Sequence, residues 1–222
     1  MSKTKLLTHG SIQLALHTLR EESGLPLLLL HGLGERSPAS IPAEYEKWSG
    51  PIYALDFTGH GQSTVPRGGG YTCELLLADV DIALAEIGSA VIVGRGLGGY
   101  IAVLAAGGRP ELVRGSVIRD GTGLAGGGSG ASSPYIGFPN PYHVITPPDP
   151  FAIVELSIDV RPPDYVTEFV RLASEFSELA RPISVCACER APWLEAVIAE
   201  VGVEVTSLSE ALIFYAKNSD VN

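Results

Sequence analysis

The sequence predicts an α/β fold in which helices flank a mostly parallel, doubly wound sheet of about eight strands. The first observation is that short apolar runs alternate along the chain with longer segments of helical periodicity. The second is that residues 26–30 are almost entirely apolar, which is typical of a strand buried on both faces of a sheet. The third is a chain of 222 residues that is 45% hydrophobic, which favours a single domain with a large core.

The N-terminal part predicts an antiparallel hairpin at one edge of this sheet. Residues 5–8 and 12–18 have strand composition, and the short turn His9-Gly10-Ser11 joins them. The other predicted strands are residues 26–30, 52–56, 90–93, 112–119, 182–188 and 203–208. The predicted helices are residues 72–87, 97–106, 162–179, 192–201 and 209–216. The first of these helices stops before Gly88, and the third has prolines at its start, as helix ends commonly do.

One long segment interrupts the alternation of strands and helices. Residues 121–150 are rich in glycine, serine and proline and show neither a helical nor a strand period. Connections of this length are often functional. We therefore expect an irregular cap or lid over residues 121–164, reduced in comparison with a full helical cap and contained within the single domain of residues 1–222.

The composition narrows the classes of function. The formal net charge is −10 without a lysine or arginine cluster, so neither nucleic acid nor a membrane is an expected partner. Three cysteines without framework spacing and an N-terminus without a signal-peptide core favour a cytoplasmic protein. The longest apolar runs are far shorter than the roughly 20 residues of a membrane span. We expect a small-molecule ligand, no cofactor and no metal, and the composition leaves a homo-oligomer open.

A glycine-rich turn lies between the predicted strand 90–93 and the predicted helix 97–106. Gly94, Gly96 and Gly99 match G-x-G-x-x-G, and Asp120 follows at the end of the next predicted strand. This combination is the fingerprint of a dinucleotide-binding turn. The fingerprint normally opens the nucleotide-binding domain, whereas several strands precede it here. Dinucleotide binding is therefore an alternative interpretation of the turn.

A larger set of motifs includes the same turn. HG at residues 31–32 follows the third predicted strand, DFTGHGQS at 56–63 follows the fourth, and GRGLG at 94–98 follows the fifth. In this order the motifs resemble the α/β-hydrolase family, over about residues 5–216. The resemblance implies the fold of that family, an oxyanion loop at residues 31–32 and a nucleophile elbow at the glycine turn.

The residues that this family uses for catalysis are replaced at the matching positions. The elbow would present Ser, Asp or Cys, but the chain has Gly96 there. The acid position after the seventh strand aligns with Ala191. The base position after the eighth strand aligns with Ala211 or Leu212, in a stretch without histidine. The candidate substitutes for the acid and the base are Asp120, Glu189 and His143.

The backbone part of such a site does not depend on these side chains. Its oxyanion donors would be the N–H groups of Leu33 and Leu97. The residues expected to bind a ligand are His31, Gly32, Leu33, Arg95, Gly96 and Leu97. The sequence thus predicts a pseudo-hydrolase that binds a small molecule or a partner without serine-hydrolase chemistry. The alternative is an enzyme of the same fold, a hydrolase, lyase or isomerase, that works without a covalent nucleophile.

Overall fold

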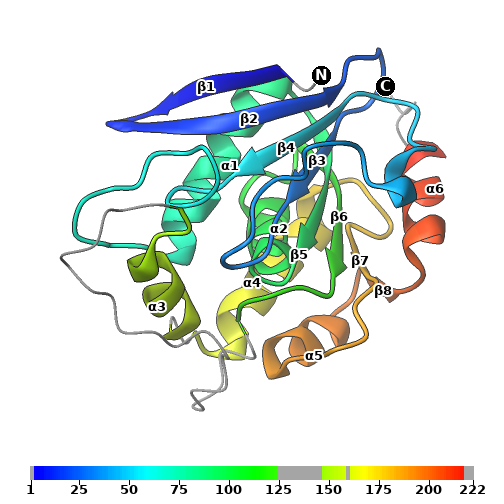
Figure 1. The fold of residues 1–222 in the computed structure, drawn as a ribbon. Coiled ribbons are helices and arrows are strands. Elements are labelled where there is room, and N and C mark those ends of the chain that lie inside the picture. Colours follow the sequence, from blue (N-terminus) through cyan, green and yellow to red (C-terminus); the bar gives the residue numbers. More distant parts are fainter. Residues whose placement is uncertain (1–2, 125–146, 159–160, 218–222) are drawn as a thin grey trace.

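The protein forms one eight-stranded sheet with helices on both faces (Figure 1). The computed structural model describes residues 3–124, 147–158 and 161–217. The strands lie in the order β1-β2-β4-β3-β5-β6-β7-β8. Their bounds are β1 Lys3–His9, β2 Ile12–Arg20, β3 Leu27–Leu30, β4 Ile52–Asp56, β5 Ala90–Arg95, β6 Val113–Arg119, β7 Ile183–Val185 and β8 Val203–Val205.

The direction of the strands confirms the predicted fold class. β1 and β2 form the predicted antiparallel hairpin, and β2 pairs antiparallel with β4. From β4 to β8 all neighbouring strands are parallel. The carboxyl ends of β3, β5 and β6 therefore meet at one edge of the sheet, and ligand sites in folds of this kind form at that edge.

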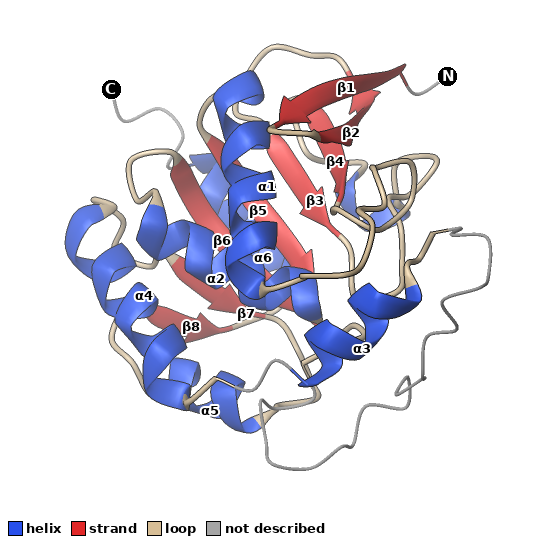
Figure 2. Ribbon diagram, turned by 90° about the vertical axis from the view of Figure 1, so that its left-hand side faces the viewer, coloured by secondary structure: helices blue, strands red, loops and turns tan. Residues whose placement is uncertain are grey.

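The helices divide between the two faces because successive side chains of a strand point to opposite faces. Leu28 and Leu30 of β3 pack in a core with α1, α2, α4 and α5, and Figure 2 shows helices of this layer in front of the strands. Leu27 and Leu29 pack in a second core with α6 and the short helix η1. The helix bounds are η1 Ala43–Tyr45, α1 Cys73–Ile87, α2 Leu97–Gly108, α3 Pro150–Ile158, α4 Pro163–Phe176, α5 Pro192–Ile198 and α6 Leu208–Lys217.

The structure corrects the prediction of an irregular segment at residues 121–164, because it contains α3. Asp149 caps this helix: its side chain accepts a hydrogen bond from the Phe151 amide at 3.1 Å, and its carbonyl accepts one from Ile153 at 3.1 Å. An acid directly before a proline is a helix start signal. The preceding residues are rich in glycine and proline, and this composition predicts an irregular segment instead. Residues 125–146 lie outside the described part of the chain, and the last two predicted strands are shorter than expected.

Carboxylates fix α3 to the loop that follows β4. The Glu155 side chain accepts hydrogen bonds from the Gly70 and Tyr71 amides, each at 2.7 Å. The Tyr71 hydroxyl donates to the buried Asp149 carboxylate at 2.6 Å. Ionised acceptors make the stronger class of hydrogen bond, so these contacts hold the helix against the body of the domain.

We expect Glu155→Ala to lower the free energy of unfolding by about 1–3 kcal/mol, because two amides lose a charged acceptor. The change should also accelerate hydrogen exchange at Gly70 and Tyr71. Urea unfolding and amide exchange measure the two effects. Glu175→Ala, at an exposed position of α4, serves as the control and should change stability by less than about 0.5 kcal/mol. Equal losses in both variants would contradict the role assigned to Glu155.

Candidate functional site

The glycine turn lies where β5 ends and α2 begins. Gly96 has φ 50° and ψ −116°, a conformation that glycine adopts readily and other residues adopt only with strain. Gly94 and Gly98 lie at close approaches, since a Cβ on either would come within 3 Å of backbone atoms. The turn has the strand–turn–helix shape of a nucleophile elbow, and glycine stands at its tip.

The chain itself occupies the space above Gly96. Residues 121–123, directly after β6, cross this space. The Thr122 carbonyl oxygen accepts hydrogen bonds from the Leu33 amide at 2.9 Å and the Leu97 amide at 3.0 Å. The Thr122 hydroxyl donates to the Leu33 carbonyl at 2.6 Å. A Cβ built on Gly96 would lie within 3 Å of the Thr122 carbonyl oxygen, closer than such atoms approach in real structures.

The two predicted oxyanion donors therefore converge on one point, as the N–H groups of an oxyanion hole do. Their acceptor is a peptide carbonyl of the same chain, so the expectation that they face a ligand is corrected. The sequence analysis did not single out Thr122. The available signal was the glycine on each side of it, because a Cβ on Gly123 would lie 2.6 Å from the Leu33 Cβ.

Asp120, the candidate substitute acid, is bonded to backbone amides. Its carboxylate accepts hydrogen bonds from the Cys188 amide at 2.9 and 3.0 Å and from the Glu189 amide at 2.8 Å. These bonds connect the end of β6 to the loop after β7. Ala191, at the aligned acid position, is the residue before α5. This part of the site therefore resembles a structural link between two strand ends.

The two positions aligned with the base lie in the last helix. Ala211 and Leu212 lie inside α6 and belong to the core between this helix and the sheet, because α6 begins at Leu208. The loop after β8 instead carries Thr206 and Ser207, whose hydroxyls donate to Glu210 at 2.9 and 2.7 Å. His143, the candidate substitute base, lies outside the described residues.

Two histidines near the elbow have both ring nitrogens in hydrogen bonds. His31 uses Nδ1 toward the Gly32 carbonyl at 2.7 Å and accepts from the Phe57 amide at Nε2, 3.1 Å away. His60 uses Nδ1 toward the Thr58 carbonyl and accepts from the Gly34 amide at Nε2, both at 3.1 Å. Each pattern requires the neutral ring.

Burial lowers the pKa of His31. Burial, reinforced by the neighbouring His31, lowers the pKa of His60 to about 4. Both imidazoles are therefore neutral at pH 7 and hold the loops around the elbow in place. In this arrangement neither ring has a nitrogen available for proton transfer to a ligand.

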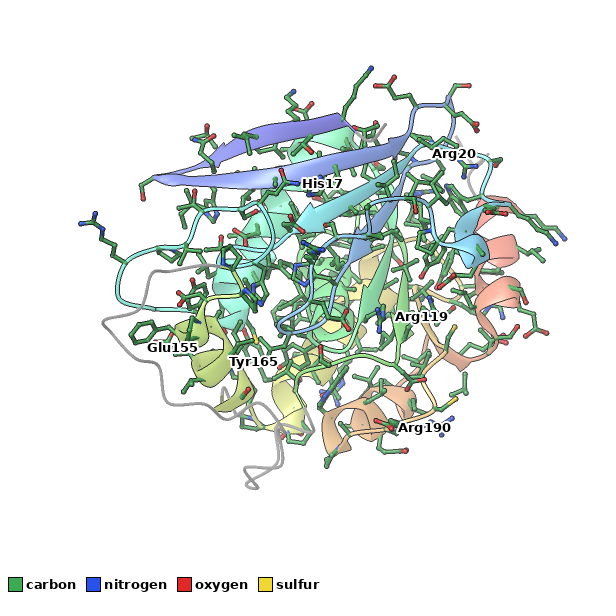
Figure 3. All side chains as sticks on the ribbon, in the orientation of Figure 1. His17, Arg20, Arg119, Glu155, Tyr165 and Arg190 are labelled. Atoms are coloured by element: carbon green, nitrogen blue, oxygen red, sulfur yellow. The ribbon has the colours of Figure 1, made fainter. Side chains whose placement is uncertain are left out.

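The loop at residues 56–63 is organised by Asp56. Its carboxylate accepts hydrogen bonds from the Ser37 amide at 2.7 Å and the Gln62 amide at 2.8 Å, and lies 2.9 Å from His17 Nε2. Figure 3 labels His17 on β2. Burial alone would raise the pKa of Asp56, but the hydrogen bonds from His17 and the two amides hold it well below the usual range. This cluster joins β2, β4 and the loop after β3, so we assign it a structural role.

A cavity of about 410 Å³ opens beside the elbow, at the carboxyl ends of β3, β5 and β6. Its apolar lining includes Leu29 and Val93, which face the α6 and η1 side of the sheet. Three arginines line it, so we call this cavity the arginine cleft. Its polar lining includes Arg36, Arg95, Arg119, Glu35, Glu44, Tyr45 and Asp120. The sequence analysis had singled out Arg95 but not the loop residues.

Of the six predicted ligand contacts, His31 and Arg95 line the arginine cleft. The other four, Gly32, Leu33, Gly96 and Leu97, lie on the side that residues 121–123 cover. The arginine cleft therefore lies on the other face of the same strand ends, away from the position above the elbow. The displacement could not be predicted, because it depends on where one backbone carbonyl lies.

The ion pairs of the arginine cleft arrange its guanidinium groups. Arg95 Nη1 lies 3.2 Å from Glu35, and its Nε donates to the Asp120 carbonyl at 3.3 Å. Arg119 Nη1 donates to Glu44 at 2.7 Å and to the Tyr45 hydroxyl at 2.6 Å. The hydrogen bond from Arg119 lowers the pKa of Glu44. Figure 3 labels Arg119 at the end of β6.

The glycine turn does not have the geometry of a pyrophosphate cradle, in which amides at a helix start face the ligand. The Leu97 amide donates to Thr122, and the Gly99 amide donates to the Gly96 carbonyl at 3.0 Å. Asp120 is turned toward the loop after β7. The geometry therefore does not support the dinucleotide interpretation.

Two further properties concern the described residues alone. Within them, no three histidine, cysteine, aspartate or glutamate side chains gather as metal ligands. Among the helices described in the structure, none is long and apolar enough to span a bilayer.

The sheet order, the N-terminal hairpin and the elbow after β5 together define the class of α/β-hydrolase folds. The chain belongs to the alpha/beta hydrolase family, whose model matches residues 27–214. This match covers every strand from β3 to β8 and all the motifs that carry the resemblance.

The relatives agree with this assignment. A curated hydrolase from Acinetobacter baylyi, (E)-2-((N-methylformamido)methylene)succinate hydrolase, is 30% identical over 128 residues. The match covers 54% of this chain and 46% of that relative, so the chain spans less than half of its length.

Two solved structures are similar to the whole domain. The thioesterase domain from the curacin biosynthetic pathway has a TM-score of 0.63 at 15% identity, covering 99% of this chain and 96% of that one. A loop variant of a haloalkane dehalogenase from Bradyrhizobium elkanii has a TM-score of 0.60 at 16% identity, covering 94% and 88% of the two chains. At these identities the likeness concerns the fold.

Proposed function

We propose that this protein is a non-catalytic member of the α/β-hydrolase family that binds a small molecule in the arginine cleft. The observation that supports it best is the Thr122 carbonyl, which accepts from both Leu33 and Leu97 while Gly96 stands at the elbow tip. Catalysis at this place would require a nucleophile and free oxyanion donors. The chain provides no nucleophile at the tip, and its own backbone uses the donors.

The surrounding polar residues support the same proposal. Asp120 is bonded to amides, and His31 and His60 are buried neutral rings with both nitrogens engaged. A general base needs a nitrogen or an oxygen within hydrogen-bond reach of a substrate proton. The arginine cleft remains as a cavity at the strand ends, where ligands of such sheets bind. We propose that the protein binds its ligand in the cytoplasm, as its three cysteines without framework spacing favour.

The competing function is hydrolysis without a covalent nucleophile, because the relative at 30% identity is named as a hydrolase. A covalent probe and a turnover assay test both forms of catalysis. We expect fluorophosphonate–biotin to leave the intact mass of the protein unchanged, since the elbow carries no hydroxyl. We also expect p-nitrophenyl acetate and butyrate to be hydrolysed no faster with the protein than in buffer alone.

If the protein shows activity, the same assays with Asp120→Asn and His143→Ala test whether either residue is responsible for it. Saturable turnover by the unmodified protein that falls at least about tenfold in either variant would replace our proposal with an enzyme. A stoichiometric fluorophosphonate adduct would contradict it as well. An unrelated serine hydrolase run in parallel shows that the probe and the substrates are active.

A further inference from the structure

Two arginines stand side by side at the ends of neighbouring strands. Arg95 of β5 and Arg119 of β6 are register partners in a parallel pair. Both lie on the face that carries Val93 and Val117, because side chains two residues apart on a strand share a face. Like charges at paired positions repel each other. The fold nevertheless places both in the lining of the arginine cleft, where an anion between them would relieve the repulsion.

The known contacts of these arginines leave donors for a ligand. Arg95 is engaged through Nε and Nη1, and Arg119 is engaged through Nη1. Among the described residues, the Nη2 group of each guanidinium has no hydrogen-bond acceptor. A guanidinium is planar, and its N–H groups match the two oxygens of a carboxylate.

The charges of the arginine cleft indicate the charge of its ligand. Three arginines and three acids, Glu35, Glu44 and Asp120, line the cleft, so their formal charges balance. The carboxylates of Glu35 and Glu44 form ion pairs with Arg95 and Arg119, whereas Asp120 directs its carboxylate at the amides of residues 188 and 189. Within the described residues, two carboxylates thus pair with the three arginines of the cleft, which favours a ligand with one negative charge.

We propose that the arginine cleft binds an organic monocarboxylate with a small apolar body, its carboxylate lying between Arg95 and Arg119. The apolar body packs on Leu29 and Val93 and beside Tyr45, whose hydroxyl Arg119 holds in place. This inference rests on the proposed function and specifies the chemical class of its ligand.

Benzoate and benzamide test the proposal, because they have the same shape and differ in charge. Isothermal titration calorimetry at low salt should show saturable benzoate binding, with benzamide at least about tenfold weaker. In ¹H–¹⁵N spectra the amides of residues 93–95 and 119–120 should shift with benzoate. Inorganic phosphate, which lacks an apolar body, should bind more weakly than benzoate.

Two variants with opposite expected effects locate the anion. Arg95→Gln should weaken benzoate binding at least about tenfold, whereas Glu35→Gln should tighten it about threefold by releasing Arg95 from its partner. A variant that only damaged the fold would not tighten binding. The matched control is Arg109→Gln: the Arg109 side chain is 45% exposed, against 48% for Arg95, and pairs with Asp81 away from the cleft.

Equal affinity for benzamide and benzoate, or an unchanged benzoate affinity in Arg95→Gln, would overturn the monocarboxylate inference and leave small-molecule binding in place. Absence of saturable benzoate binding would overturn the inference too. The proposed lack of catalysis is decided by turnover and covalent labelling, so the two failures are distinguishable.

Discussion

Gly96→Ser should fail to create a hydrolase and should destabilise the protein by about 2–4 kcal/mol. A serine at φ 50° pays roughly 1 kcal/mol for the left-handed backbone. Its Cβ also collides with the Thr122 carbonyl, and overpacking of this kind costs about 1–3 kcal/mol. Urea unfolding measures the loss. Hydrolysis of p-nitrophenyl acetate should stay at the rate measured in buffer alone, since the proposed function gives the new serine neither an acid nor a base.

Gly10→Ser is the matched control for this prediction. Gly10 has φ 59°, and a Cβ there would meet no atom within 4 Å. The control therefore pays the backbone cost without the collision and should lose about 1 kcal/mol. If both serine variants were equally stable, the Thr122 carbonyl would not fill the space above the elbow. A Gly96→Ser variant that turned over esters would show that the space and the oxyanion donors are accessible.

The second large effect is a loss of stability in mild acid, caused by the buried histidines. The pKa of His60 is lowered from 6.5 to about 4 in the folded protein, and the pKa of His31 is lowered as well. Between pH 4 and pH 6.5 the His60 ring binds a proton in the unfolded chain but not in the folded chain, so the stability of the fold rises with pH. The contribution of His60 to the free energy of unfolding is fully present above pH 6.5 and is lost as the pH falls toward 4. A shift of this size corresponds to roughly 3 kcal/mol.

Urea unfolding at several pH values between 4.5 and 6.5 measures this slope. His60→Gln should lower the proton uptake on unfolding by about one proton, while the contribution of His31 remains. Proton NMR gives a second measurement on the unmodified protein, in which the His60 ring signals should stay unshifted from pH 8 to pH 5. Titration of His60 near pH 6.5 would contradict the burial and the hydrogen bonds that we assign to it.

Much of the fold could be predicted from local patterns. The apolar run of β3 and the helical spacing of α1 are periodic signals of neighbouring residues, and the order of such elements restricts a parallel sheet to few topologies. The elbow was predictable for the same reason, since Gly94, Gly96 and Gly98 lie within one turn. The start of α3 was missed because its signal, Asp149 before a proline, follows a segment of opposite character.

The candidate site could be predicted only in part. Gly96 and the lack of a histidine in residues 203–222 are facts of the sequence, and the proposal of a non-catalytic protein starts from them. Ala211, the position aligned with the base, lies within α6, as the predicted helix 209–216 already implied. The arginine cleft combines β5, β6 and the loop after β3, and the contacts that shape it join residues as far apart as Glu44 and Arg119.

The order of residues along the chain decides which elements form and which side chain stands at the tip of the turn, because hydrogen bonding and periodicity act between near neighbours. Which space remains for a ligand is decided by the folded chain alone. The Thr122 carbonyl reaches Leu33 across a separation of 89 residues, and no local pattern encodes that contact. A backbone carbonyl can accept two hydrogen bonds anywhere the fold brings donors to it, so its place depends on packing rather than on side-chain identity.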